Sequence, residues 1–407
     1  MSVNFSIADI DNQLSETGQF SLPEWLLDQN LLPYARYEAW RYGELNSLTE
    51  ALGWDKEQLQ QLLKAAASGC GKLKLQAEPL DYFAWTTEQK PLKLSADISE
   101  ANALASVWRR PEDMPQMDLF MDNSAVVGEN TLQLNLAARQ FNKAQQSLKK
   151  LTDLNPRNAK LGAYQDLLNY GLHMEASPNI DWQDYPAELD GLLREVAPLA
   201  KETLKALSRD YLANGWRRLA GNSPGVIDAN SSWQLSPAFA LSQIPDWSAV
   251  LMELKKNAST YQHPELLCLL ANGYFYSDEP QLGYFVWGQI AERFPEFAET
   301  AIGKHELAKK HVLLTETWDA FLAFDEHWPS QWFLGYLLIA RPGLVHLMDQ
   351  LPQTVSDPIK SSVNQTVLQL VQAKIRDEDQ KLLRAQLKSA APSLLKFFMN
   401  KRDWYAR

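Results

Sequence analysis

The sequence predicts an all-α protein built mainly from packed helix pairs. From about residue 130 almost to the end of the chain, apolar residues recur at steps of three and four, which places them on one side of a helix. The composition, 45% hydrophobic and 22% charged, is that of a chain that folds around a core. The length of 407 residues exceeds the ~250–300 at which a single core stops growing, so we expect several units or an elongated stack.

Three helical stretches with recognisable end signals are expected between Ser21 and Gly69. "SLPEWLLDQN" starts with Ser21 as the capping residue and has Pro23 in its first turn, where no amide hydrogen is needed. "YARYEAWRYGELNSLTEALG" has the helical spacing and ends at Gly53, because glycine readily adopts the left-handed conformation that closes a helix. "DKEQLQQLLKAAASG" repeats this order, with Asp55 as the cap and Gly69 as the stop.

The pattern changes after Cys70. "KLKLQAE" and "PLKLS" alternate apolar and polar residues, which predicts two short strands forming one β-hairpin near residues 72–96. "WRRPEDMPQMDLFMDNSA", residues 108–125, is dense in Pro, Asp and Met and predicts an irregular connection. We therefore expect an N-terminal helical unit in residues 1–125 and a second helical domain in residues 126–407.

The second domain is expected to begin with a helix pair, "TLQLNLAARQ" and "NKAQQSLKKLTDL", broken near Phe141. Gly, Pro, Asn and Ser in residues 220–233 predict a surface loop. Further helices are expected at about residues 160–174, 186–220, 236–244, 246–258, 264–276, 281–293, 297–312, 315–324, 331–349 and 357–389.

The stretch from Leu267 to Pro295 has a regular alternation of bulky and small residues over two helices. Its key positions are Leu267, Leu270, Ala271, Tyr274, Gly283, Trp287 and Pro295. Ala271 and Gly283 are small enough for two helices to approach closely, whereas Tyr274 and Trp287 are large enough to fill the space between neighbouring pairs. This pattern resembles the tetratricopeptide repeat, whose signature places such residues at these steps.

Two other segments share part of the pattern. Pro329 follows Pro295, and Phe321 follows Trp287, at the repeat step of the family, which is about 34 residues. Lys304 and His305 depart from it, since they stand where a leucine and a small residue belong. An earlier segment repeats the second-helix spacing with Ala144, Leu148, Leu151 and Pro156. The resemblance covers about residues 130–165 and 264–330, and it implies an α-solenoid of tetratricopeptide type in residues 126–407 with an additional N-terminal helical unit.

The net charge and the cysteine content indicate which binding partners and which cellular compartment to expect. The formal net charge is −11, so binding to nucleic acid or to an anionic membrane surface is not expected. Two cysteines without nearby histidines predict no zinc site, and they fit a reducing compartment. The start of the chain lacks the pattern of a signal peptide, and the longest apolar run, Trp332–Ala340, is too short to span a membrane. We expect a soluble cytoplasmic protein.

No segment has the spacing of a catalytic or metal site. In "HELAKKH", His305 and His311 are separated by about 240° around a helix, so they cannot chelate one ion from a regular helix. "SGCGKL" lacks the first glycine and the hydroxyl residue of a phosphate loop and is better explained as a helix end.

Three further stretches have an ordinary explanation. "FDEHWP" is typical of a solvated helix end. The methionines of "MPQMDLFM" suit apolar contacts better than copper, and "NKRDWYAR" fits the polar exit of a last helix or a docking tail. We therefore predict no metal, no cofactor and no catalytic residue.

The resemblance also implies where a partner binds. First helices of tetratricopeptide units line a groove that holds extended peptides, and the corresponding positions here are Glu265, Cys268, Asn272, Phe275 and Tyr276. Family members that clamp a C-terminal carboxylate have lysine at the position of Cys268, so such capture is not expected. The alternative for these five residues is contact with a neighbouring helix of the same chain.

Three functions remain open from the sequence. The repeat pattern favours a non-enzymatic adaptor or scaffold that binds a protein or peptide in a concave groove. The second is an all-helical enzyme with an active site between the N-terminal unit and the solenoid. The third is a sensor that binds a small apolar ligand through Trp25, Tyr34, Tyr37 and Trp40.

Overall fold

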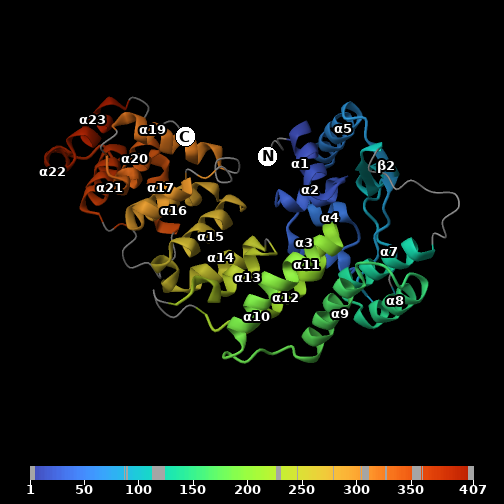
Figure 1. The fold of residues 1–407 in the computed structure, drawn as a ribbon. Helices are drawn as coiled ribbons and strands as arrows, with labels where there is room; N and C mark the ends of the chain where they lie inside the picture. Colours follow the sequence, from blue (N-terminus) through green and yellow to red (C-terminus); the bar gives the residue numbers. More distant parts are fainter. Residues whose placement is uncertain are drawn as a thin grey trace. The chain divides into compact units, whose positions relative to one another are not determined.

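The structure is a computed structural model, and it describes residues 5–86, 88, 90–111, 124–225, 231–244, 246–277, 279–302, 304, 311–325, 328–350, 359 and 361–401. Over these residues the fold is predominantly helical with one small sheet, which confirms the all-α class (Figure 1). The chain divides into two compact units: unit 1 is Met1–Pro224 with Gln243–Asp246, and unit 2 is Gly225–Ser242 with Trp247–Arg407. The boundary expected near residue 125 falls within the span of unit 1.

The N-terminal helices of unit 1 follow the sequence signals in part: the stretch expected as one helix from Tyr34 to Gly53 is divided in two, and one further helix precedes Ser21. Their bounds are α1 (Ile7–Thr17), α2 (Leu22–Asp28), α3 (Tyr34–Arg41), α4 (Leu48–Leu52) and α5 (Lys56–Lys72). Asp55 caps α5 by accepting a hydrogen bond from the amide of Gln58, and Gly53 closes α4 with a φ of 70°. The stop predicted at Gly69 is wrong. The helix continues to Lys72, and Gly69 packs against Ile10, whose Cδ1 would lie 2.5 Å from an added Cβ.

A three-stranded antiparallel sheet lies in the same unit, in the order β1-β3-β2. The strands are β1 (Phe20–Ser21), β2 (Gln76–Pro79) and β3 (Ser106–Arg109), and α6 (Ile98–Ala105) directly precedes β3. The hairpin predicted near residues 72–96 is wrong in its pairing, since β2 pairs with β3 and not with residues 91–95. A single bridge between Phe83 and Pro91 is the β pairing found within the described part of residues 72–96. Alternation of apolar and polar residues marked a strand but carried no information on its partner.

The rest of unit 1 is a succession of helices, and the stretch expected as one helix over residues 186–220 is interrupted at Lys205, where φ is 51°. Their bounds are α7 (Ser124–Ala137), α8 (Phe141–Leu154), α9 (Leu161–Ala176), α10 (Tyr185–Gly191), the π-helical η2 (Leu192–Val196), α11 (Ala197–Leu204), η3 (Lys205–Leu207) and α12 (Ser208–Asn222). The predicted break near Phe141 is confirmed, because α8 begins there after a turn in which Arg139 has a φ of 60°. Ala144 is fully buried where α7 and α8 pack.

Unit 2 is helical throughout its described residues. Its elements are η4 (Trp233–Leu235), α13 (Pro237–Ser242), α14 (Trp247–Lys256), η5 (Ala258–Gln262), α15 (Pro264–Phe275), α16 (Pro280–Arg293), α17 (Pro295–Ile302), α19 (Val312–Phe324), η6 (Ser330–Trp332), α20 (Phe333–Ala340), η7 (Pro342–Gln350), α21 (Ser362–Ile375), α22 (Lys381–Ala390) and α23 (Pro392–Asn400). The stretch 357–389 was expected as one helix. In its described part it forms α21 and α22, separated by a turn in which Asp377 has a φ of 55°.

The predicted hairpin of α15 and α16 is present and closely packed. Ala271 is fully buried, and an added Cβ on Gly283 would meet the Phe275 ring at 2.9 Å. Tyr274 and Trp287 are buried in the core. α16 ends at Arg293, and Pro295 then opens α17, while the helix with which α16 packs most extensively further along the chain is α20. The regular stacking of a tetratricopeptide solenoid stays a prediction.

Candidate functional site

One side of α15 carries the residues that the sequence assigned to a partner site: Glu265, Cys268, Asn272, Phe275 and Tyr276, here called the α15 face. Each of them is half-buried. The other side of the helix, with Leu266, Leu267, Leu270, Ala271 and Tyr274, is buried in the core of unit 2. The helix is therefore fixed on one side and partly open to solvent on the other.

The start of α15 is defined by the sequence around Pro264. His263 is extended, and Pro264 follows in the first turn, where its fixed φ suits a helix and its missing amide hydrogen is not needed. Glu265 also lies in the first turn, close to the partial positive charge of the helix start, where a carboxylate is stabilised. The negative end of the α15 face thus lies at the helix start.

The aromatic end of the α15 face is held by contacts within unit 2. Phe275 stacks on His311, with 4.1 Å between ring centroids, and meets the ring of Tyr284 edge-on at 5.2 Å. Tyr276 stacks on Trp247 at 5.0 Å. Both rings therefore contact neighbouring residues of the same chain, which is the alternative to partner binding that the sequence analysis left open. They form a rigid wall rather than free anchors.

The polar part of the face consists of Glu265, Cys268 and Asn272. Burial raises the pKa of the Cys268 thiol to about 12, the nearby Glu265 carboxylate adds to this, and Lys304 opposes it. The thiol is therefore neutral at physiological pH and is a poor nucleophile. Within the described part of the chain, the Asn272 side-chain amide has no hydrogen-bond partner, so its two donors and one acceptor are available.

A second cluster, which the sequence analysis missed, lies inside unit 1. Arg139, from the turn between α7 and α8, donates to Glu38 of α3 at 3.0 Å, and Arg217 of α12 pairs with the same carboxylate. Arg217 also reaches Asp246 at 3.3 Å. Glu38 is 8% exposed, so its charge is largely removed from water and depends on these two arginines.

Further ion pairs extend the cluster from α12 to α3 and α2. Arg41 pairs with Asp210 at 3.5 Å, while Arg209 pairs with Glu24 at 3.0 Å and with Asp28. Burial raises the pKa of Asp210 against the pull of the arginines. Burial also raises the pKa of Glu24 to about 7, even though Arg209 lies beside it.

This cluster had no signal in the sequence, because the paired residues are 29 to 185 positions apart and share no spacing. Perturbed carboxyl groups are common in active sites, so the cluster is where the enzyme hypothesis finds its best support. Neither of the two cavities described below opens onto it, however. We interpret it as the connection that ties α2 and α3 to α12.

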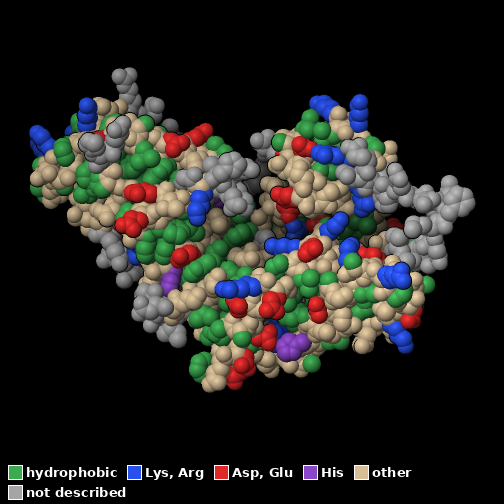
Figure 2. Space-filling view, in the orientation of Figure 1, with side chains coloured by type: hydrophobic (Ala, Val, Ile, Leu, Met, Phe, Trp, Pro, Cys, Tyr) green, Lys and Arg blue, Asp and Glu red, His purple; other side chains and the backbone are tan. Residues whose placement is uncertain are grey.

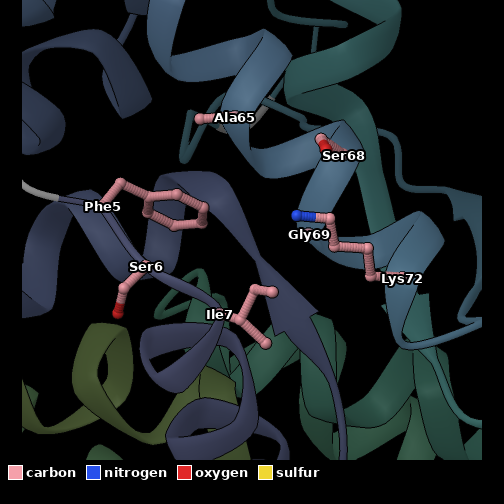
Figure 3. A pocket seen from close by; sticks show the side chains of 7 residues that line it. All are labelled: Phe5, Ser6, Ile7, Ala65, Ser68, Gly69 and Lys72. Atoms are coloured by element: carbon pink, nitrogen blue, oxygen red, sulfur yellow. The ribbon is translucent and has the colours of Figure 1, made fainter.

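Two cavities found among the described residues are small and lie elsewhere. One of about 260 Å³ is lined by Phe5, Ser6 and Ile7 at the start of α1 and by Ala65, Ser68, Gly69 and Lys72 near the end of α5 (Figure 3). The other, about 130 Å³, is lined by Val345, His346, Gln372, Ile375 and Arg376. The first contains part of "SGCGKL", but these residues form the C-terminal turns of a helix, where carbonyl groups face outward and repel phosphate.

Several other residues noted in the sequence lie outside the described part of the chain. They are His305, Glu326 and His327, residues 114–121 of "MPQMDLFM" and residues 402–407 of "NKRDWYAR". The aromatic residues of the sensor hypothesis are described, and Trp25, Tyr34, Tyr37 and Trp40 are at most 4% exposed, as core residues are. The described residues contain no group of three or more His, Cys, Asp or Glu arranged for a metal. In the same residues, no helix has the length and apolar character needed to cross a bilayer.

Comparison with known proteins gives no family assignment: no family model, curated protein or solved structure matches the chain. The fold and the site define a predominantly helical protein in which α15 of unit 2 is buried on one side and half-buried on the other.

Proposed function

We propose that the protein is a tetratricopeptide-like adaptor that binds a protein or peptide partner along the α15 face. The supporting observation is the asymmetry of α15. Five of its residues on one side are fully in the core, while Glu265, Cys268 and Asn272 on the other side keep polar groups within reach of solvent. A helix fixed in this way presents its open side without rearrangement, which lowers the cost of binding.

The chemistry of the face favours an extended segment of a partner. The Asn272 amide can donate to a backbone carbonyl and accept from a backbone amide of the partner. Glu265, about two helical turns earlier, suits a basic side chain. The stacked rings of Phe275 and Tyr276 supply a flat apolar wall at the other end. Since the Cys268 thiol is neutral, Cys268 itself offers no charge for a C-terminal carboxylate.

The proposal is tested by selecting a displayed library of random peptides on the protein. Peptides enriched on the wild type are then measured by fluorescence anisotropy against the double variant Glu265→Ala/Asn272→Ala. Met252→Ala serves as the matched control, because Met252 is 54% exposed on α14 of the same unit. Both altered residues of the double variant are half-buried, so thermal melting checks that it stays folded.

We expect selected peptides to bind the double variant at least about tenfold more weakly, which corresponds to the loss of about 1.4 kcal/mol, and to bind the control unchanged. Peptides that bind the double variant as tightly as the wild type would place the binding surface elsewhere. Failure to enrich any peptide would contradict the adaptor function. Peptides sensitive to Glu24→Gln but not to the double variant would favour the cluster in unit 1.

A further inference from the structure

Charge is segregated between two helices of unit 2. α22 contains three basic residues, Lys381, Arg384 and Lys388, and no acidic residue. They recur at steps of three and four, so they form one stripe along the helix. α19 contains two acidic residues, Glu316 and Asp319, and no basic residue.

Four of the five charged groups on these two helices are available to another molecule, whereas Arg384 is half-buried, donates to Gln380 at 2.6 Å and lies over the Phe398 ring. Glu316, Asp319, Lys381 and Lys388 are exposed. Within the described residues, none of these four side chains has an ion-pair partner. In Figure 2, Lys and Arg side chains are visible at the end of unit 2 that Figure 1 labels α22 and α23. Surface charges normally gain little from partners within one chain, but complementary patches guide association between chains.

Apolar side chains lie beside the charges on both helices. Leu382 is 71% exposed on α22. Val312 and Leu313 are 52% and 51% exposed on α19, and Phe324 at its other end is 39% exposed. Each helix therefore has exposed apolar surface and charges of one sign within its own length, while the turn before α22 adds the exposed carboxylates of Asp377, Glu378 and Asp379.

We propose that α19 of one copy of this chain docks on α22 of a second copy. Two α22 surfaces would bring basic stripes together, and two α19 surfaces would bring carboxylates together, so neither symmetric pairing matches the charges. The α19–α22 pairing places Glu316 and Asp319 opposite Lys381, Arg384 and Lys388. Because the two surfaces differ, the contact is either made twice about a two-fold axis in a dimer or repeated head to tail in rings or open chains of copies.

The contact is expected to be weak and reversible. α22 has 10 residues and α19 has 13, so the helices are about 15 and 20 Å long. One pair of helix faces of this length buries less than the ~1,200 Å² of a standard stable interface. Association should therefore appear at high micromolar concentration and decline with salt, because screening shortens the reach of exposed charges to a few Å at about 1 M salt.

The test is sedimentation velocity of the full chain over a range of concentrations and at low and high salt. The variants are Lys381→Glu/Lys388→Glu and Glu316→Lys/Asp319→Lys, each measured alone and in an equimolar mixture. Lys149→Glu/Lys150→Glu is the matched control, because these lysines are exposed on α8 of unit 1. Thermal melting confirms that each variant is folded.

The wild type and the control should associate with rising concentration, and each double variant alone should associate at least about tenfold more weakly. The mixture should associate again, since each reversed surface then meets a complementary one on the other variant. A wild type that stays monomeric at every concentration and salt would overturn the proposal. So would association that survives both charge reversals, or a mixture that remains dissociated. None of these outcomes depends on the α15 face, so they leave the adaptor function to its own test.

Discussion

Replacing Asn364 by alanine should cause one of the largest stability losses available in unit 2. Asn364 is fully buried on α21 and joins three elements. Its Nδ2 donates to Oε1 of Glu292 on α16 at 2.8 Å and to the carbonyl of Gln331 in η6 at 2.9 Å. Its Oδ1 accepts from the amide of Gly335 on α20 at 3.0 Å.

The magnitude follows from these three bonds. Two of them are between neutral groups, worth about 1 kcal/mol each, and the bond to the Glu292 carboxylate is worth about 1.5–3 kcal/mol. Alanine has the higher helix propensity, which offsets roughly half a kcal/mol. Asn364→Ala should therefore lower the free energy of unfolding by about 3–4.5 kcal/mol, most of it because the Gly335 amide and the Glu292 carboxylate each lose a buried partner.

The assay is urea unfolding followed by tryptophan fluorescence. Gln369→Ala is the matched control, because Gln369 is exposed on the same helix and its replacement also gains some helix propensity, without losing a buried bond. The control should change the free energy of unfolding by less than about 0.5 kcal/mol. A loss below about 1 kcal/mol for Asn364→Ala, or one no larger than in the control, would refute the claim that this residue holds the elements of unit 2 together.

Three further outcomes are expected. Ala271→Leu should overpack the α15–α16 hairpin and cost about 1–3 kcal/mol in urea unfolding, and an unchanged midpoint would contradict the close approach of these helices. Gly171→Ala should destabilise the protein, because the added Cβ would lie 2.2 Å from the Phe141 ring. Gly162→Ala on the same helix is the control: its added Cβ meets nothing within 4 Å, so it should stabilise the protein by about 0.5–1 kcal/mol. The pKa of Glu24 is about 7 in the folded protein, against 4.5 for an unperturbed carboxyl. At a pH between these two pKa values folding takes up a proton, so the free energy of unfolding falls as pH rises from about 5 to 8. Glu24→Gln should flatten that dependence, and an equally steep profile in the variant would assign it to another group.

Local features of the fold were predicted where one residue and its neighbours determine the outcome. The Asp55 cap, the Gly53 stop and the break before Phe141 are of this kind, since capping and turn preferences act within a few residues. Gly69 shows the opposite case. A glycine near a helix end is typical of a helix stop. At position 69, however, a glycine is needed because Ile10 of another helix lies in close contact with it.

Longer-range features were not available from the sequence. β2 ends at Pro79, and its partner strand begins only at Ser106, beyond α6, so alternation alone does not identify it. The five residues of the α15 face could be placed on one side of a helix from their spacing. That Phe275 stacks on His311, which lies beyond α16 and α17 in the chain, depends on the packing of separate helices and became visible only in the structure.

The most direct measurement for the adaptor function is site-specific photo-cross-linking in the cells that make the protein. A photoreactive phenylalanine derivative is introduced in place of Cys268, between Glu265 and Asn272 on the α15 face, and at Met252 on α14 as the control. The adaptor function predicts a discrete cross-linked product from position 268 that is absent from position 252 and is lost when Glu265→Ala is added. No product from position 268, or the same product from both positions, would contradict partner binding along α15.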